Sequence, residues 1–123
     1  MSAKVTDQKD GTVQTTNATA TTAVTYTVPA NSIAIVYAYV MALNAASGDS
    51  KGFTPWASVL REGGAPAVVG SVVNMITPQG SAGATTWTST IAISGNDVIV
   101  QVAGAIAATI EWRVRLVVEY YTP

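Results

Sequence analysis

The C-terminal segment constrains the fold most, because apolar residues occupy every second position along it. These apolar positions are Ile110, Trp112, Val114, Leu116, Val118 and Tyr120. The positions between them are Thr109, Glu111, Arg113, Arg115, Val117 and Glu119. Successive side chains of a strand point to opposite faces of its sheet. The segment is therefore predicted to be a strand with one core face and one charged face.

Alternation of this kind recurs through most of the chain, with Gly, Pro, Asn and Ser residues between the alternating segments. Residues 32–44 are apolar on both faces, which predicts a long strand buried on both sides. Gly63-Gly64 is expected to supply the positive φ values of a tight hairpin between residues 53–62 and 67–76. No segment has a convincing helical period with caps. The expected fold is all-β, an antiparallel jelly-roll-like β-sandwich of about seven or eight strands.

Residues 1–21 differ from the rest of the chain. Four of its charged residues fall within the first ten positions: Lys4, Asp7, Lys9 and Asp10. The residues that follow are polar and β-branched, and such a segment cannot bury enough apolar surface to fold alone. We expect an extended N-terminal arm over residues 1–21, either flexible or laid on a neighbour, and a β-sandwich domain over residues 22–123.

Charged residues make up only 11% of the chain, against about 25% in ordinary soluble domains. A folded monomer of this size exposes about 6,200 Å² of surface. We therefore expect other protein to cover much of that surface in the working state. The net charge of −1 gives no electrostatic attraction to nucleic acid or anionic lipid, so neither is an expected partner. The longest mostly apolar run, residues 33–43, is too short for a membrane span.

The residue types also restrict the chemistry. The chain has no histidine and no cysteine, which removes the usual triads, thiolate nucleophiles and zinc sites. Asp49 and Asp97 lie in polar turns, where Asp normally bonds its own backbone. One carboxylate in the loop of residues 44–49 is too few for a tight calcium site. We predict a protein that is not an enzyme, with no catalytic residue, no cofactor and no metal.

The span from Val24 to Tyr120 resembles a family of small β-sandwich proteins among the virion structural proteins of tailed bacteriophages. The resemblance lies in turns and strand patterns: Tyr26-Thr27-Val28-Pro29-Ala30-Asn31-Ser32, Leu60-Arg61-Glu62-Gly63-Gly64, Val69-Gly70-Ser71, Ser94-Gly95-Asn96-Asp97-Val98 with Val102-Ala103-Gly104, and Ile110-Glu111-Trp112-Arg113-Val114-Arg115. It implies a virion component, either a capsid decoration (cement) protein or a part of a tail or fibre. The chain lacks a long repetitive shaft, which favours a compact module on the capsid surface.

The partners expected from this resemblance are other copies of the chain, most simply in a homotrimer, and the major capsid protein or another virion protein. Without the apolar stretch of a signal peptide, synthesis in the host cytoplasm is expected. The candidate interface residues are Trp56, Trp87, Arg113, Arg115, Lys4 and Val5. As an alternative, Trp56 or Trp87 stacks on a host glycan in a tail or fibre tip. Four other aromatic residues fall at apolar strand positions and are expected in the core: Tyr26, Tyr37, Tyr39 and Trp112.

Overall fold

The C-terminal alternation forms strand β10 (Ile110–Tyr121) of a computed structural model that describes residues 4–123. β10 lies between β1 (Val5–Thr15) and β3 (Ser32–Leu43), and both pairings are antiparallel. Its core face and its charged face are both as predicted, because Trp112 is 1% exposed whereas Arg113 and Arg115 are exposed.

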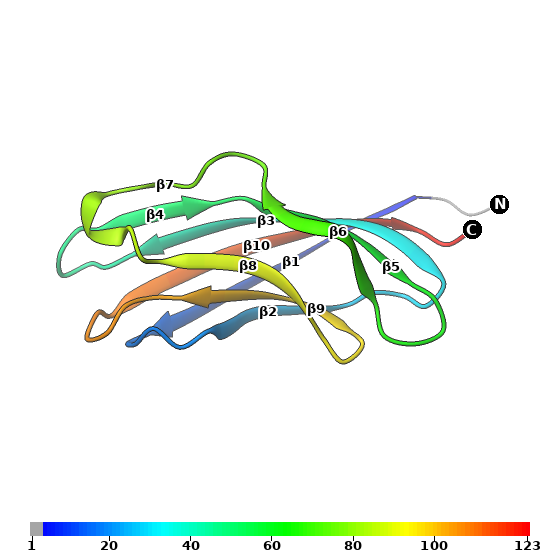
Figure 1. The fold of residues 1–123 in the computed structure, drawn as a ribbon, viewed down its shortest axis with the longest axis horizontal. Coiled ribbons are helices and arrows are strands. Elements are labelled where there is room, and N and C mark those ends of the chain that lie inside the picture. The colour runs from blue at the N-terminus through cyan, green and yellow to red at the C-terminus, as the bar shows by residue number, and fades with distance from the viewer. Residues whose placement is uncertain (1–3) are drawn as a thin grey trace.

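β3 is the centre of a seven-stranded sheet, which we call the large sheet (Figure 1). On the side away from β10, β3 pairs with two short strands in turn, β4 (Ser50–Phe53) and β5 (Pro55–Arg61). The break between these strands at Thr54 precedes Pro55, which has no backbone N–H to donate to a ladder. β6 (Ala67–Asn74) extends the sheet beyond β5, and β7 (Gln79–Gly80) extends it beyond β4.

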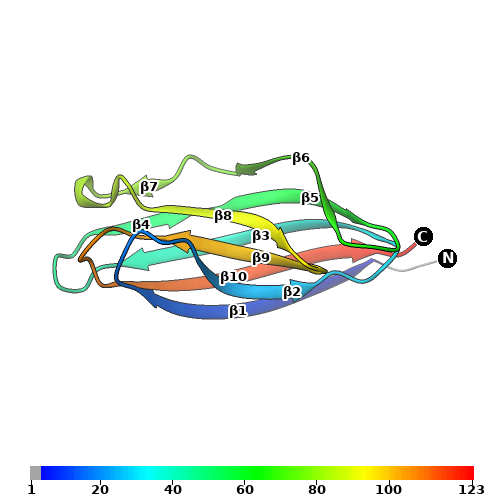
Figure 2. The same ribbon diagram turned by 60° about the horizontal axis from the view of Figure 1, so that its bottom comes forward.

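The second layer, which we call the small sheet, contains three antiparallel strands: β2 (Thr21–Thr27), β9 (Asp97–Ala103) and β8 (Thr88–Ser94), in that order. A single turn of 3₁₀ helix, η1 (Ala82–Ala84), precedes β8. Figure 2 shows the small sheet in front of the large one, with β1 and β6 at opposite edges. The predicted antiparallel β-sandwich is confirmed, with ten strands where about seven or eight were expected.

The core lies between the two sheets. Trp112 is its centre: its ring stacks on Phe53 with the centroids 6.0 Å apart, and it lies 6.2 Å from the ring of Trp87. The Trp112 indole Nε1 donates a hydrogen bond of 2.9 Å to the Thr15 hydroxyl at the end of β1. This bond satisfies a buried donor that would otherwise be costly to desolvate.

The expectation that β3 is buried on both sides is wrong. Its inward side chains are small and fully buried: Ala34, Val36, Ala38, Val40 and Ala42. Its outward side chains are larger, and Met41 and Tyr39 remain 62% and 48% exposed. The small sheet covers only one face of the large sheet, and within residues 4–123 no third layer lies over the other face.

The predicted N-terminal arm is also corrected. Residues 5–15 of it form β1, an edge strand of the chain's own large sheet, paired with β10 along its whole length. The arm was inferred from low apolar content, and indeed residues 5–10 are exposed. Backbone pairing with β10 orders the segment without any need for apolar side chains. Residues 1–3 of the arm lie outside the described residues.

The hairpin between β5 and β6 is confirmed, but the reasoning about its glycines is wrong. Neither Gly63 nor Gly64 has a positive φ, because the connection is longer than a two-residue turn. A positive φ is instead required at Gly95, where a two-residue turn joins β8 and β9 and φ is +58°. Such a turn is the kind that matches the twist of the flanking strands.

Two N-terminal truncations should differ strongly in stability. Deleting residues 1–10 removes only exposed side chains of β1 and is expected to leave the sandwich folded. Deleting residues 1–16 also removes Val13 and Thr15, and leaves the Trp112 indole without its acceptor, which costs about 1–3 kcal/mol for the hydrogen bond alone. Urea unfolding of both variants measures the difference. Equal stabilities would show that the Thr15 end of β1 does not anchor the strand.

Candidate interaction surface

The outer face of the large sheet carries a continuous band of apolar side chains. Along β3 these are Ile33, Ile35, Tyr37, Tyr39, Met41 and Leu43. The pairing register continues the band onto neighbouring strands, because Tyr37 is opposite Trp56 and Ile33 is opposite Leu60. On β6, Val73 lies opposite Trp56 in turn. We call this band the outer apolar face.

Charged residues of β10 border the outer apolar face on one side. Arg113 lies opposite Met41, and Arg115 lies opposite Tyr39. The Arg115 Nε is 3.6 Å from an Asp10 carboxylate oxygen on β1. Glu111 and Glu119 lie on the same face, further along β10 in either direction. This border contains both signs of charge, so a partner that covers it needs polar groups of both kinds.

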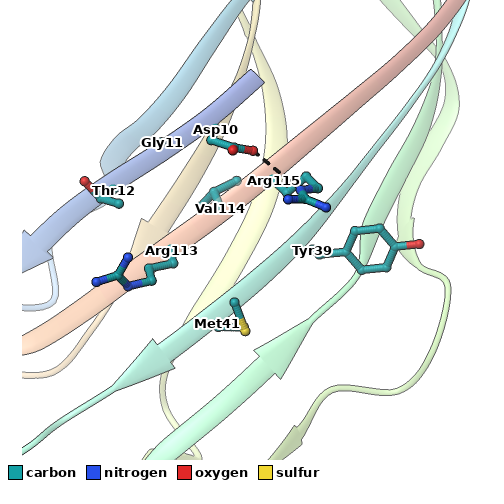
Figure 3. A pocket seen from close by; sticks show the side chains of 8 residues that line it. All are labelled: Asp10, Gly11, Thr12, Tyr39, Met41, Arg113, Val114 and Arg115. Carbon is teal, nitrogen blue, oxygen red and sulfur yellow. Dashed lines mark ion pairs between the residues drawn. The ribbon is translucent and has the colours of Figure 1, made fainter. Parts of the chain in front are cut away.

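Shallow grooves flank Tyr39 and Met41 on both sides. The first, of about 400 Å³, lies between these residues and the β1–β10 pair, with Arg113 and Arg115 on its wall (Figure 3). The second, of about 320 Å³, lies between them and the segment of residues 76–79, and its lining is almost wholly apolar. Two half-exposed side chains between two grooves form a ridge that a complementary protein surface can grip, as anchor residues do in interfaces.

At the far end of the face, Lys4 forms an ion pair with Glu119, with an Nζ to Oε1 distance of 2.7 Å. The Tyr37 hydroxyl donates a hydrogen bond of 3.2 Å to the same carboxylate. The Lys4 ammonium lowers the pKa of Glu119 below its usual value, and Glu119 raises the pKa of Lys4. Partial burial, followed by its hydrogen bond to Glu119, raises the pKa of the Tyr37 hydroxyl. These contacts pin the start of β1 to β10 and β3.

The lowered pKa of Glu119 predicts a pH dependence at this end of the sheet. A carboxyl whose pKa is lower in the folded state stabilises the fold above its unfolded pKa, and loses that contribution as the pH falls through the folded pKa. In an NMR titration, Lys4→Ala should therefore raise the Glu119 midpoint towards the ordinary glutamate value. An unchanged Glu119 midpoint would mean that the ion pair does not persist in solution.

The structure brings together four of the six candidate interface residues. Arg113, Arg115, Lys4 and the half-buried Trp56 all lie on the outer face of the large sheet. Val5 is exposed, but it pairs with Tyr120 and faces the opposite side of the sheet.

The assignment of Trp87 to an interface is wrong. Its side chain is 2% exposed and packs against Trp112 in the core, so it reaches neither a partner protein nor a glycan. Its position beside a glycine-rich loop suggested a strand end, but η1 turns the ring inward just before β8 begins.

Sequence reasoning missed Tyr39 and Met41, the two side chains that form the ridge. Tyr39 was assigned to the core, and both faces of β3 were expected to be buried. A signal was present in the sequence, because the bulky residues of β3 all share one face while the other face carries only small residues, Ser32 followed by Ala and Val. Small residues fit opposite the large rings of Phe53 and Trp112, so the face with less bulk is the core face.

The carboxylates in turns have hydrogen-bonding partners of their own. Asp49 accepts hydrogen bonds from the hydroxyls of Ser47 and Ser81, and Asp97 accepts one of 2.6 Å from Thr27. Residues 4–123 contain no group of three or more acidic side chains that could hold a metal ion. Within the same residues, no helix is long and apolar enough to span a bilayer. Comparison of the chain with protein-family models and with curated proteins gives no match.

Proposed function

We propose that this chain is a non-catalytic structural subunit that packs the outer apolar face of its large sheet against another protein of an assembly. The observation that carries the proposal is the exposure of Tyr39 and Met41, together with Ile35 and Leu43, on one face of the central strand. Large exposed apolar patches on soluble proteins mark interaction sites. A central strand with apolar residues on both faces is typical of sheets that are covered on both sides.

The charge distribution supports the same proposal. The few charged residues on the outer face lie along one border, on β10 and β1, and leave the ridge of Tyr39 and Met41 free of charge. Interfaces have this arrangement, with an apolar centre and a polar rim. The outer side of the large sheet is twelve residues long along β3 and about four strands wide, since β5 and β6 flank β3 at one end and β4 and β7 at the other. These dimensions give an area of roughly 800 Å². That area matches what each partner buries in a stable interface.

The assembly that we propose is the head of a tailed bacteriophage, with this chain as a decoration protein on the capsid surface. The turn and strand patterns that resemble virion sandwich proteins support this choice. In this account the outer apolar face lies on the capsid shell and bridges adjacent capsid subunits. The tail-tip alternative loses one of its two glycan anchors because Trp87 is buried, and Trp56 is only half-exposed beside Tyr37.

The location and copy number of the protein in virions test this function. A decoration protein is expected to co-sediment with heads that lack tails, and to be present in a copy number similar to that of the shell subunits. Quantitative mass spectrometry of purified heads and of purified tails gives both values. Presence in tails alone, in a few copies, would support the tip alternative, and absence from both fractions would contradict a virion role.

A further inference from the structure

The two long edge strands of the large sheet, β1 and β6, differ in how they are protected against pairing with another strand. The β1 edge carries Lys4, Asp7, Lys9 and Asp10. Lys9 turns inward, where its ammonium donates a hydrogen bond of 2.7 Å to the Thr25 carbonyl oxygen of β2. Charged side chains, and above all inward-pointing ones, are the devices by which natural sheets prevent edge-to-edge association. β1 is therefore a guarded edge.

β6, at the opposite edge, lacks charged side chains that would protect it in this way. It pairs with β5 alone within residues 4–123, so the backbone groups along its other side have no strand partner there. Residues 63–96 contain no charged residue at all, a stretch that includes β6, β7, η1 and β8. Val69 and Val73 of β6 are about half exposed on the outer side, whereas Val68 and Val72 pack against the core. A strand can add to this edge without burying an unpaired charge.

Two outward-facing valines of β6, Val69 and Val73, lie two residues on either side of Ser71, and this symmetric placement matters for self-pairing. Two copies related by a two-fold axis through Ser71 run antiparallel, and Val69 of one then lies opposite Val73 of the partner subunit. Both valines face outward, because their partners on β5 are Ser58 and Trp56 of the outer face. Such cross-strand valine pairs stabilise antiparallel sheets.

A bulge in β6 shapes this edge. The register with β5 shifts between Trp56 and Ser58, and Gly70 has a φ of +85°. The bulge leaves regularly paired stretches on either side of it, residues 67–69 and 73–74. In a two-fold pair the first stretch of one copy meets the second stretch of the other, so the valine contacts lie outside the bulge.

We propose that β6 is a strand-addition site whose occupant is β6 of a second copy of this chain. The inference rests on the proposed structural role and names one of its partners. Pairing of this kind joins two large sheets edge to edge and makes their outer apolar faces continuous. It closes with two copies, since a two-fold interface uses the same surface on both. The proposed oligomer therefore has two copies, whereas the resemblance suggests three.

The test is the mass of the full chain in solution over a wide concentration range, by sedimentation equilibrium. The wild-type protein is expected to approach twice the 12.6 kDa chain mass. Val69→Lys with Val73→Lys should raise the dimer dissociation constant by roughly 100-fold, because two like-charged ammonium groups then meet across the pair. The matched control is Val5→Lys with Ile106→Lys, which adds the same charge at exposed residues away from β6 and should leave the dimer intact.

Hydrogen exchange gives a second measurement that does not depend on a variant's folding. The amides of residues 67–74 in the wild-type chain should become more protected as the protein concentration rises, while those of β1 should not. A chain that stays monomeric, or a trimer that the β6 substitutions leave unchanged, overturns the proposal. A monomer that still binds phage heads overturns β6 pairing and leaves the proposed function standing. A β6-paired dimer that binds no virion component would support β6 pairing and contradict the proposed function.

Discussion

Trp112→Ala is expected to lower the free energy of unfolding by about 3–5 kcal/mol, as in other truncations of buried aromatic residues. Trp112 is fully enclosed between the sheets and contacts the rings of both Phe53 and Trp87. Alanine leaves a cavity that a rigid sandwich cannot close, and it also removes the buried donor that bonds to Thr15. Urea unfolding followed by fluorescence of the remaining tryptophans measures the change.

Trp56→Ala is the matched control for this substitution, because the same side chain is removed from a half-exposed position on the outer face. It should cost much less than Trp112→Ala in the free protein. A loss below about 1 kcal/mol for Trp112→Ala, or equal losses for the two variants, would contradict the assignment of the faces of β10.

Tyr39→Glu with Met41→Glu is expected to leave the free protein folded and to weaken its binding to the assembly by roughly 100-fold or more. Both side chains are substantially exposed in the free chain, so the substitution creates no cavity. Association then loses both apolar anchors and must desolvate two carboxylates, and their attraction to Arg115 and Arg113, which lie opposite them on β10, does not offset that cost. Co-sedimentation with heads measures the binding, and thermal unfolding measures the fold.

Val5→Glu with Ile106→Glu is the control for the outer-face variant. It introduces the same two charges at exposed apolar residues, one facing the other side of the large sheet and one in the loop before β10. This control should bind heads as the wild type does. If the Tyr39 and Met41 variant binds heads as tightly as the wild type, the outer apolar face is not part of the interface.

Local periodicity predicts the strands of this chain well, and the reason is clearest in β10. Charged and apolar residues alternate there, so the charged face must lie towards solvent and the apolar face must lie in the core. The sandwich follows from many such segments with turn residues between them. The segment of residues 5–15 was misassigned because strand pairing at an edge is a backbone interaction, which leaves little trace in side-chain pattern.

The candidate surface was predictable only in part. The arginines of β10 were found because charge within a strand is conspicuous, whereas Tyr39 and Met41 resemble core residues in any sequence pattern. An apolar residue that is exposed until a partner protein binds and an apolar residue of the core are the same residue types in a sequence. Only the absence of a third layer over β3, within the part of the chain that the structure describes, separates the two cases.

Covalent labelling of Met41 tests most directly whether the outer apolar face is covered in the working assembly. Hydroxyl radicals should oxidise Met41 readily in the free protein, where the side chain is 62% exposed. In intact heads we expect strong protection of Met41, while Ile106 reacts at the same rate in both samples. Equal oxidation of Met41 in free and assembled protein would show that this face remains exposed to solvent in the assembly, and would contradict the proposed role.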